Sequence, residues 1–182
     1  MERSDPGGLS PARLVAAIVG LVIVDAVTKY FAVDLLVPVH VPHPIIGDVV
    51  RLTLVYNPGA AFGLHLGPWS RLIFIGLTFL ALAVVWSLYR SSAPSVLSRT
   101  RVLALAAVAG GAIGNLVDRV RSPRGVVDFM DIGVGDWRWP TFNVADTAVT
   151  IGALTLAVVL WREDAEAARA RAAQVDSPSP QS

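Results

Sequence analysis

The sequence has no cysteine and few charged residues. The absence of cysteine excludes a disulfide scaffold, a thiol nucleophile and a cysteine-ligated zinc site. Only 16% of the 182 residues are charged and 54% are hydrophobic, whereas about a quarter of the residues in a soluble domain are charged. The mean hydropathy is +0.59. The composition therefore predicts a single domain that lies in a membrane.

An excess of charge and a histidine cluster are also missing. Lys+Arg total 15 against 14 for Asp+Glu, a net charge of +1, which excludes a nucleic-acid-binding protein driven by bulk charge. His40 and His43 lie in a proline-rich segment without a helix to align them, which argues against a metal site. Neither H-E-x-x-H nor G-x-S-x-G occurs, so the common zinc-peptidase and serine-hydrolase motifs are absent.

Long runs without charge indicate where the chain crosses the membrane. Residues 72–89 are 18 uncharged residues between Arg71 and Arg90. At 1.5 Å per residue, such a run just spans a hydrocarbon core of about 30 Å with its flanks. Three further apolar stretches follow the same pattern, although Asp25 and Lys29 interrupt the first. We expect an all-α polytopic membrane protein with four spans, at residues 14–33, 71–89, 102–118 and 142–161.

The first span has some features of a cleaved secretory signal, because Arg3 and Arg13 precede its apolar core. Asp25 and Lys29 fall inside it and no A-x-A-like site follows, so we interpret it as a retained helix. Four spans place both termini on one side, and that side carries 8 arginines against 6 on the other. This excess favours cytoplasmic termini.

The segments between the spans differ from the helices. Residues 34–70 contain five prolines, which exclude a long helix. Val49–Tyr56 alternates like a β-strand, and Gly125–Met130 is a second short β-like piece that could pair with it outside the membrane. We expect residues 1–161 to form one membrane domain. Residues 162–182 begin as an Ala-rich charged helix but cannot bury a core, so we expect a disordered cytoplasmic tail.

Polar residues at membrane depth are costly and often mark function. Asp25 and Lys29 are spaced i, i+4 and share a helix face, as either a self-neutralising pair or part of a site. Gly110 and Gly114 permit close helix packing. Packing does not explain the polar residues directly after them, Asn115, Asp118 and Arg119. Considered alone, Asp146 is typical of a helix cap, while Asp131 and Asp136 are typical of loops.

Five segments occur in order along the chain: DAVTK (25–29), NPGAAFG (57–63), GGAIGNLVDR (110–119), VVDF (126–129) and FNVAD (142–146). Together they closely resemble the lipoprotein signal peptidases, also called signal peptidase II. The resemblance covers residues 14–161. It implies an integral-membrane aspartic endopeptidase of the bacterial cytoplasmic membrane. Such an enzyme cleaves prolipoproteins just before a cysteine that carries diacylglycerol.

The same resemblance implies specific residues and a fold. The catalytic aspartates would be Asp128 and Asp146, near the outer face of the membrane. Asn57, Asn115, Arg119 and Asn143 would bind the substrate backbone or orient the aspartates, and Gly59 would allow close backbone approach. Asp25 and Lys29 would brace the first helix against the site. Four transmembrane helices with a small extracytoplasmic β-cradle are implied, with a short helix near residues 60–66. We expect a monomer with no cofactor and no metal.

Two carboxyl groups suit this chemistry, because like charges about 3 Å apart share a proton instead of both ionising. One member can take a proton from water while the other hydrogen-bonds the scissile carbonyl. The sequence does not assign these roles, since the proton belongs to the pair. A small transporter or proton channel would also explain charged residues in spans, and a structural adaptor would fit the composition. Neither explains the five segments.

Overall fold

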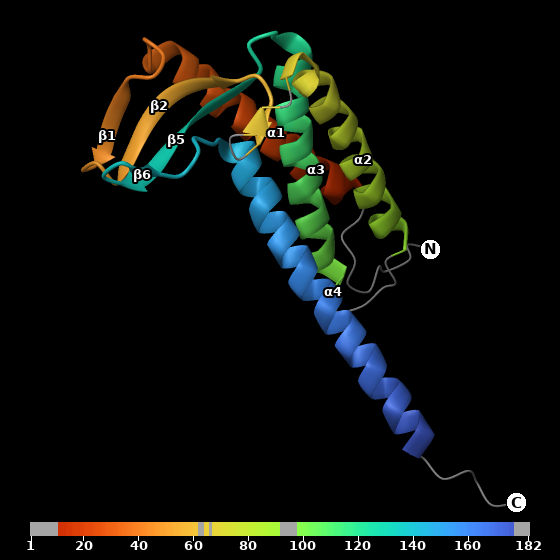
Figure 1. Ribbon diagram of the computed structural model, residues 1–182. Helices are drawn as coiled ribbons and strands as arrows, with labels where there is room; N and C mark the ends of the chain where they lie inside the picture. The colour runs from red at the N-terminus through yellow and green to blue at the C-terminus, as the bar shows by residue number, and fades with distance from the viewer. Residues whose placement is uncertain (1–10, 62–63, 66, 92–97, 177–182) are drawn as a thin grey trace, which may run out of the picture.

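A computed structural model describes residues 11–61, 64–65, 67–91 and 98–176 of the chain, and it contains four long helices beside a small sheet (Figure 1). The helices are α1 (Pro11–Leu35), α2 (Ser70–Arg90), α3 (Ser98–Arg121) and α4 (Val144–Asp176). The antiparallel sheet has the order β1 (Pro42–Ile46), β2 (Val50–Asn57), β5 (Val126–Val134) and β6 (Trp137–Arg138).

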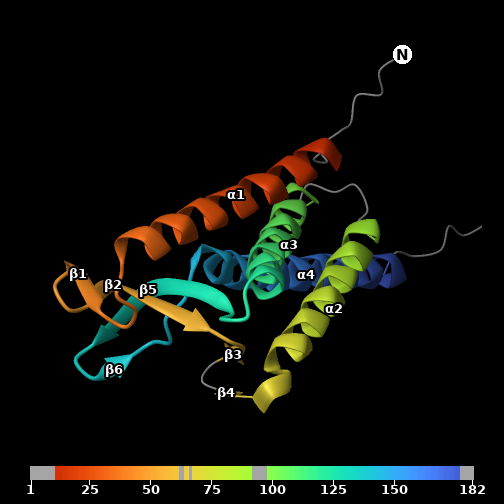
Figure 2. The ribbon, with the colours of Figure 1, turned by 90° about the horizontal axis from the view of Figure 1, so that it is seen from above.

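All four helices are long and apolar enough to cross a membrane, and each predicted span falls on one of them. In the most apolar stretch of α3, 56% of the residues are buried, against 0% in α2. Figure 2 shows α3 between α1 and α2, so the outer faces of the surrounding helices expose the apolar side chains. An apolar exterior of this kind requires lipid as its solvent, and the protein is a multi-pass membrane protein.

Small residues allow α3 to occupy the centre of the bundle. A Cβ atom on Gly110 would lie 2.7 Å from Leu21 Cδ2 of α1, and one on Gly111 would lie 2.8 Å from Val149 Cγ2 of α4. A side chain at either position would therefore push a neighbouring helix away. The predicted packing role of the glycines in this segment is confirmed. They lie on two faces of α3, one packed against α1 and the other against α4.

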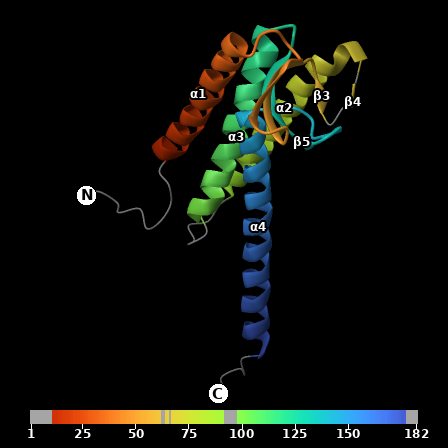
Figure 3. The ribbon, with the colours of Figure 1, turned by 90° about the vertical axis from the view of Figure 1, so that its left-hand side faces the viewer.

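The predicted pairing of the two β-like segments is also confirmed. β2 and β5 are antiparallel, with Val55 opposite Asp128. Leu54 and Phe129 pack against Ala32 and Leu36 at the end of α1, which fixes the sheet to one end of the helical bundle (Figure 3). Because side chains alternate along a strand, this packing turns Asp128 to the opposite side of β5 from Phe129.

One expectation from the sequence is wrong. The described residues of the segment expected to form a short helix near 60–66 are strands instead: Ala60–Ala61 (β3) pairs with Leu64–His65 (β4), and a 3-10 turn follows at Gly67–Trp69. Gly59 and Gly67 flank this segment with φ values of +125° and +70°, which a helix does not contain. The Ala-rich charged segment after the fourth span is helical as expected, and α4 continues to Asp176 (Figure 1), because an Ala-rich sequence readily extends a helix that already exists. Residues 177–182 lie outside the described residues.

Asp131 is not the ordinary loop carboxylate that the sequence indicated. It lies buried in β5, where its oxygens pair with Arg51 Nη2 at 2.8 Å and Arg138 Nη2 at 2.6 Å. Burial raises the pKa of Asp131, but the hydrogen bonds from Arg138, Arg51 and Thr53 outweigh it and hold that pKa below its usual value. Asp131 therefore joins β2, β5 and β6 through charge-assisted bonds.

At the end of the bundle away from the sheet, Arg101 links three helices. Its Nη1 atom lies 2.6 Å from Glu163 Oε2 of α4, and its Nη2 atom donates to the carbonyl oxygen of Leu88 in α2 at 3.0 Å. Arg101 itself belongs to α3 and is buried. This contact fixes the spacing of α2, α3 and α4 at the opposite end from the candidate site.

Candidate active site

The first turn of α4 holds Asp146 through a reciprocal cap with Asn143. The Asn143 Oδ1 atom accepts the N–H of Asp146 at 2.9 Å, and Asp146 Oδ2 accepts the N–H of Asn143 at 3.2 Å. This is the geometry of a capping box, so the capping interpretation of Asp146 is correct for one of its oxygens. The other oxygen, Oδ1, accepts Asn115 Nδ2 of α3 at 2.7 Å.

Asn143 also reaches the second predicted aspartate. Its Nδ2 atom donates to Asp128 Oδ1 at 2.7 Å, and Asn57 Nδ2 donates to Asp128 Oδ2 at 3.1 Å. Asn143 is fully buried and Asp128 is almost fully buried. A single asparagine therefore binds both Asp128 and Asp146, which lie on different elements and 18 positions apart in the sequence.

The environment of Asp128 favours its neutral form. Burial raises the pKa of this carboxyl group to about 7, and the negative charge of Asp146 adds to the increase. The hydrogen bonds from Asn57 and Asn143 oppose the shift but do not cancel it. A carboxyl group with a pKa near 7 can hold a proton and release it at neutral pH.

Asn57 is fixed by the tight turn that follows β2. Its Oδ1 atom accepts the N–H of Gly59 at 3.0 Å, which leaves Nδ2 directed at Asp128. A Cβ atom on Gly59 would lie 2.8 Å from Ser70 Cβ. The close approach predicted at Gly59 is therefore made to the start of α2.

Arg119 lies beside the two aspartates without bonding to them. Its Nη1 atom donates to the carbonyl oxygen of Asn115 at 3.3 Å, and its Cζ atom lies 5.2 Å from the centre of the Phe74 ring. The buried Nε atom has no hydrogen-bond partner among the described residues. Within the same residues Arg119 forms no ion pair with Asp128 or Asp146, and its side chain lines the cavity beside these aspartates.

A cavity of about 680 Å³ opens beside these groups. Its polar end is formed by Asn57, Asn115, Arg119, Asp128 and Asp146. Most of the remaining wall is apolar and comes from α2, α3, α4 and the segment before α4; it includes Phe74, Leu77, Ala81, Trp139, Phe142, Val149 and Ile151. Paired carboxyl groups at one end of an apolar cavity suit hydrolysis of a bond in a largely apolar substrate.

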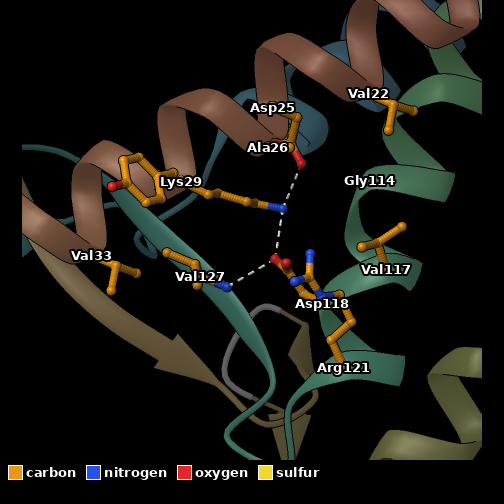
Figure 4. A pocket seen from close by; sticks show the side chains of 11 residues that line it. Val22, Asp25, Ala26, Lys29, Val33, Gly114, Val117, Asp118, Arg121 and Val127 are labelled. Atoms are coloured by element: carbon orange, nitrogen blue, oxygen red, sulfur yellow. Dashed lines mark hydrogen bonds and ion pairs between the residues drawn. The ribbon is translucent and has the colours of Figure 1, made fainter.

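Asp25 and Lys29 are buried behind the aspartates. Lys29 Nζ lies 2.7 Å from Asp25 Oδ2 and 2.9 Å from Asp118 Oδ2 (Figure 4). It also lies 2.9 Å from Asn115 Oδ1. The i, i+4 spacing allowed Asp25 and Lys29 to neutralise each other alone. In the structure Lys29 also pairs with a second acid, Asp118 of α3. Asp118 was not among the predicted site residues. The sequence did indicate Asp118, because it is one of the polar residues at membrane depth that directly follow the glycines of the third span.

Among the described residues, no group of three or more histidine, cysteine or acidic side chains could hold a metal ion. The two carboxyl groups at the cavity, with amide and guanidinium donors beside them, can support acid–base chemistry.

Comparisons with known proteins show what the chain is similar to. Residues 17–162 match the family model described as Signal peptidase (SPase) II. The lipoprotein signal peptidase of Nitratidesulfovibrio vulgaris (strain DP4) is 40% identical over 155 residues, covering 83% of this chain and 91% of that protein. That of Syntrophus aciditrophicus (strain SB) is 37% identical over 160 residues, covering 86% and 97%. A solved bacterial membrane enzyme, determined by the in meso method, has a TM-score of 0.75 and 26% identity over 88% of this chain and 94% of its own.

Proposed function

Because the chain belongs to the signal peptidase II family, whose members are membrane proteases that process prolipoproteins, we propose that it acts as an aspartic endopeptidase with Asp128 and Asp146 as its catalytic pair. One observation carries the proposal. Asn143 donates to Asp128 and is bound reciprocally to Asp146, at the polar end of a large apolar cavity. Removing either carboxyl group would leave the other without its chemical partner.

The environments of the two carboxyl groups support different roles. Asp128 has a raised pKa and supplies the proton that hydrogen-bonds the scissile carbonyl oxygen. Asp146 lies at the N-terminus of α4 and accepts two donors, a setting that stabilises a carboxylate. Asp146 takes a proton from water, whose oxygen attacks the carbonyl carbon. When the C–N bond breaks, a proton from the pair passes to the leaving amine.

The neighbouring polar groups support this reaction in defined ways. Asn57, Asn115 and Asn143 hold the oxygens of the pair by hydrogen bonds. Arg119 lines the cavity, and its guanidinium binds the substrate backbone or the negative oxygen of the tetrahedral intermediate.

The cavity wall supports a lipid-modified substrate. Its apolar surface, formed by three helices, suits a transmembrane signal peptide and the acyl chains beside the scissile bond. The reaction removes the signal peptide just before the cysteine that carries diacylglycerol. The enzyme acts as a monomer and needs no cofactor.

The orientation in the membrane is part of the proposal. Residues 1–161 form the peptidase domain of the bacterial cytoplasmic membrane, with both termini in the cytoplasm and the active site near the outer face. The exposed Trp69 and Trp137 lie at the sheet end of the bundle, where aromatic side chains anchor a protein at the membrane interface. Residues 162–182 extend into the cytoplasm.

The substrate proposal is tested with purified protein in lipid nanodiscs. Synthetic prolipoproteins with and without diacylglycerol on the cysteine are incubated with the protein, and the products are identified by mass spectrometry. We expect a single cut before the cysteine in the lipidated substrate only. Equal cleavage of both substrates would contradict the lipid requirement. Ion flux in liposomes without any cleavage would favour the transporter alternative.

A further inference from the structure

We propose that Lys29 is the positioning residue of the reaction, because its ammonium group holds together the three groups that fix the aspartates from behind. The inference rests on the proposed role of Asp128 and Asp146. Lys29 is the only lysine in the chain. It is buried inside the bundle and takes no part in the proposed bond-breaking steps.

The contacts of Lys29 use all of its donors. An ammonium group carries three hydrogens and accepts none. Its nitrogen meets three acceptors, Asp25 Oδ2, Asp118 Oδ2 and Asn115 Oδ1, at 2.7 to 2.9 Å. A planar guanidinium has a longer reach and a fixed fork, so arginine would not reproduce these three directions.

Each acid bound by Lys29 holds the backbone directly before one of the aspartates. Asp25 Oδ1 accepts the N–H of Ala145, which precedes Asp146, at 2.9 Å. Asp118 Oδ2 accepts the N–H of Val127, which precedes Asp128, at 3.2 Å (Figure 4). Lys29 therefore links the two backbone segments that carry the pair.

The third contact helps to set the direction of a hydrogen bond at the site. Lys29 Nζ and Asn143 Nδ2 both donate to Asn115 Oδ1, at 2.9 and 3.1 Å, so the amide of Asn115 turns its Nδ2 atom toward Asp146 Oδ1, which it reaches at 2.7 Å. Without the ammonium group, Asn115 Oδ1 loses the shorter of its two hydrogen bonds and keeps only the one from Asn143, so the amide is held less firmly. Lys29 thus contributes to both the spacing of the pair and the direction of the donor that Asp146 receives.

Lys29 can be reached without entering the substrate cavity. A separate niche of about 250 Å³ lies between α1, α3 and β5 and is lined by Lys29, Asp118, Arg121 and Tyr30 among others. In Figure 4 the Lys29 side chain crosses this niche toward Asp118. A small amine can therefore take the place of a truncated lysine while substrate occupies the catalytic cavity.

The experiment combines truncation with chemical rescue in nanodiscs. Lys29→Ala should lower kcat about 100-fold, the loss that a displacement of about 1 Å produces, with KM changed less than about twofold. Added n-propylammonium should restore kcat at least about tenfold, whereas n-propanol, of equal length but neutral, should not. Thr28→Val is the matched control. Its hydroxyl bonds only to α1 carbonyls, and its kcat should match the wild type.

A charge-matched double variant separates positioning from neutralisation. In the wild type, Lys29, Asp25 and Asp118 carry one positive and two negative charges, a net charge of one carboxylate. The double variant Lys29→Met, Asp118→Asn keeps only the charge of Asp25 and therefore has the same net charge. We expect this double variant to regain thermal stability over Lys29→Met without regaining kcat. Recovery of kcat in the double variant, without amine rescue of Lys29→Ala, would overturn the proposal. So would wild-type kcat in Lys29→Ala.

The proposed function has a separate readout. If Asp128→Asn and Asp146→Asn remain active, the catalytic pair is wrong whatever Lys29 does. If both are inactive and Lys29→Ala is fully active, the pair stands and only the positioning role fails.

Discussion

Asn143 offers the sharpest test of the hydrogen-bond network, because one side chain caps α4 and donates to Asp128. Loss of an asparagine cap costs about 1 kcal/mol, and loss of a buried bond to a carboxyl group costs about 2 kcal/mol. Asn143→Ala loses both and should be about 3 kcal/mol less stable. For a protein of this size that corresponds to a fall in Tm of about 6–12 °C.

Asn143→Asp keeps the cap acceptor but replaces the donor with a carboxyl group. When ionised, the new group faces Asp128 Oδ1, which accepts Asn143 Nδ2 at 2.7 Å. Two unit charges 4 Å apart repel by about 4 kcal/mol at an effective dielectric constant of 20. When protonated at lower pH, the new group can donate to Asp128 again. The variant should therefore be less stable than Asn143→Ala at pH 7.5 and more stable at pH 5.

The assay is thermal unfolding of both variants in detergent, followed by tryptophan fluorescence at the two pH values. Thr28→Val serves as the control, since the Thr28 hydroxyl donates to the Val24 and Asp25 carbonyl oxygens of α1. Its Tm should change with pH by the same amount as the wild-type Tm. The same order of stability for the two Asn143 variants at both pH values would refute the assigned hydrogen-bond directions.

Four further predictions follow from single contacts. The raised pKa of Asp128 means that the folded state holds a proton between about pH 4 and pH 7, so stability from this group is lost as pH rises through that range. The free energy of unfolding of Asp128→Asn, measured relative to that of the wild type, should therefore rise by up to about 4 kcal/mol between about pH 4 and pH 7. Arg119→Ala should lower kcat about 100-fold in the cleavage assay with a change in stability below about 1 kcal/mol; unchanged kcat would remove it from the site. Gly114→Ala places a Cβ atom 2.6 Å from Asp25 Oδ2 and should cost about 1–3 kcal/mol in thermal unfolding; wild-type Tm would contradict the packing. Arg101→Ala should cost about 3–5 kcal/mol, because Glu163 is left partly buried and unpaired, and a loss below about 1 kcal/mol would show that the contact is only peripheral.

The spans and the strand pairing could be predicted from the sequence because each depends on a local pattern. Uncharged runs such as residues 72–89 need only length and composition, and Val49–Tyr56 needs only alternation. The prediction of a short helix near residues 60–66 was wrong, because a resemblance between motifs does not determine the backbone conformation beside Gly59, where φ is +125°.

The ion pairs could not be predicted, because they depend on register and packing. Asp131 meets Arg51 across a strand pair and Arg138 across a hairpin, and no sequence spacing indicates that both reach one carboxylate. Asp118 and Lys29 lie on different helices and meet only because Gly110 and Gly114 let α1 approach α3. The five sequence segments indicated which residues lie together at the candidate site. Only the structure shows which atom of each residue donates or accepts each hydrogen bond.

The central claim is that Asp128 and Asp146 together perform the hydrolysis. The most direct measurement is single-turnover release of the signal peptide from a lipidated prolipoprotein by purified Asp128→Asn and Asp146→Asn, with folding verified by thermal unfolding. Each variant should remain folded and bind the substrate, yet release signal peptide at least about 1,000-fold more slowly than the wild type. Release within about tenfold of the wild-type rate by either variant would contradict the account.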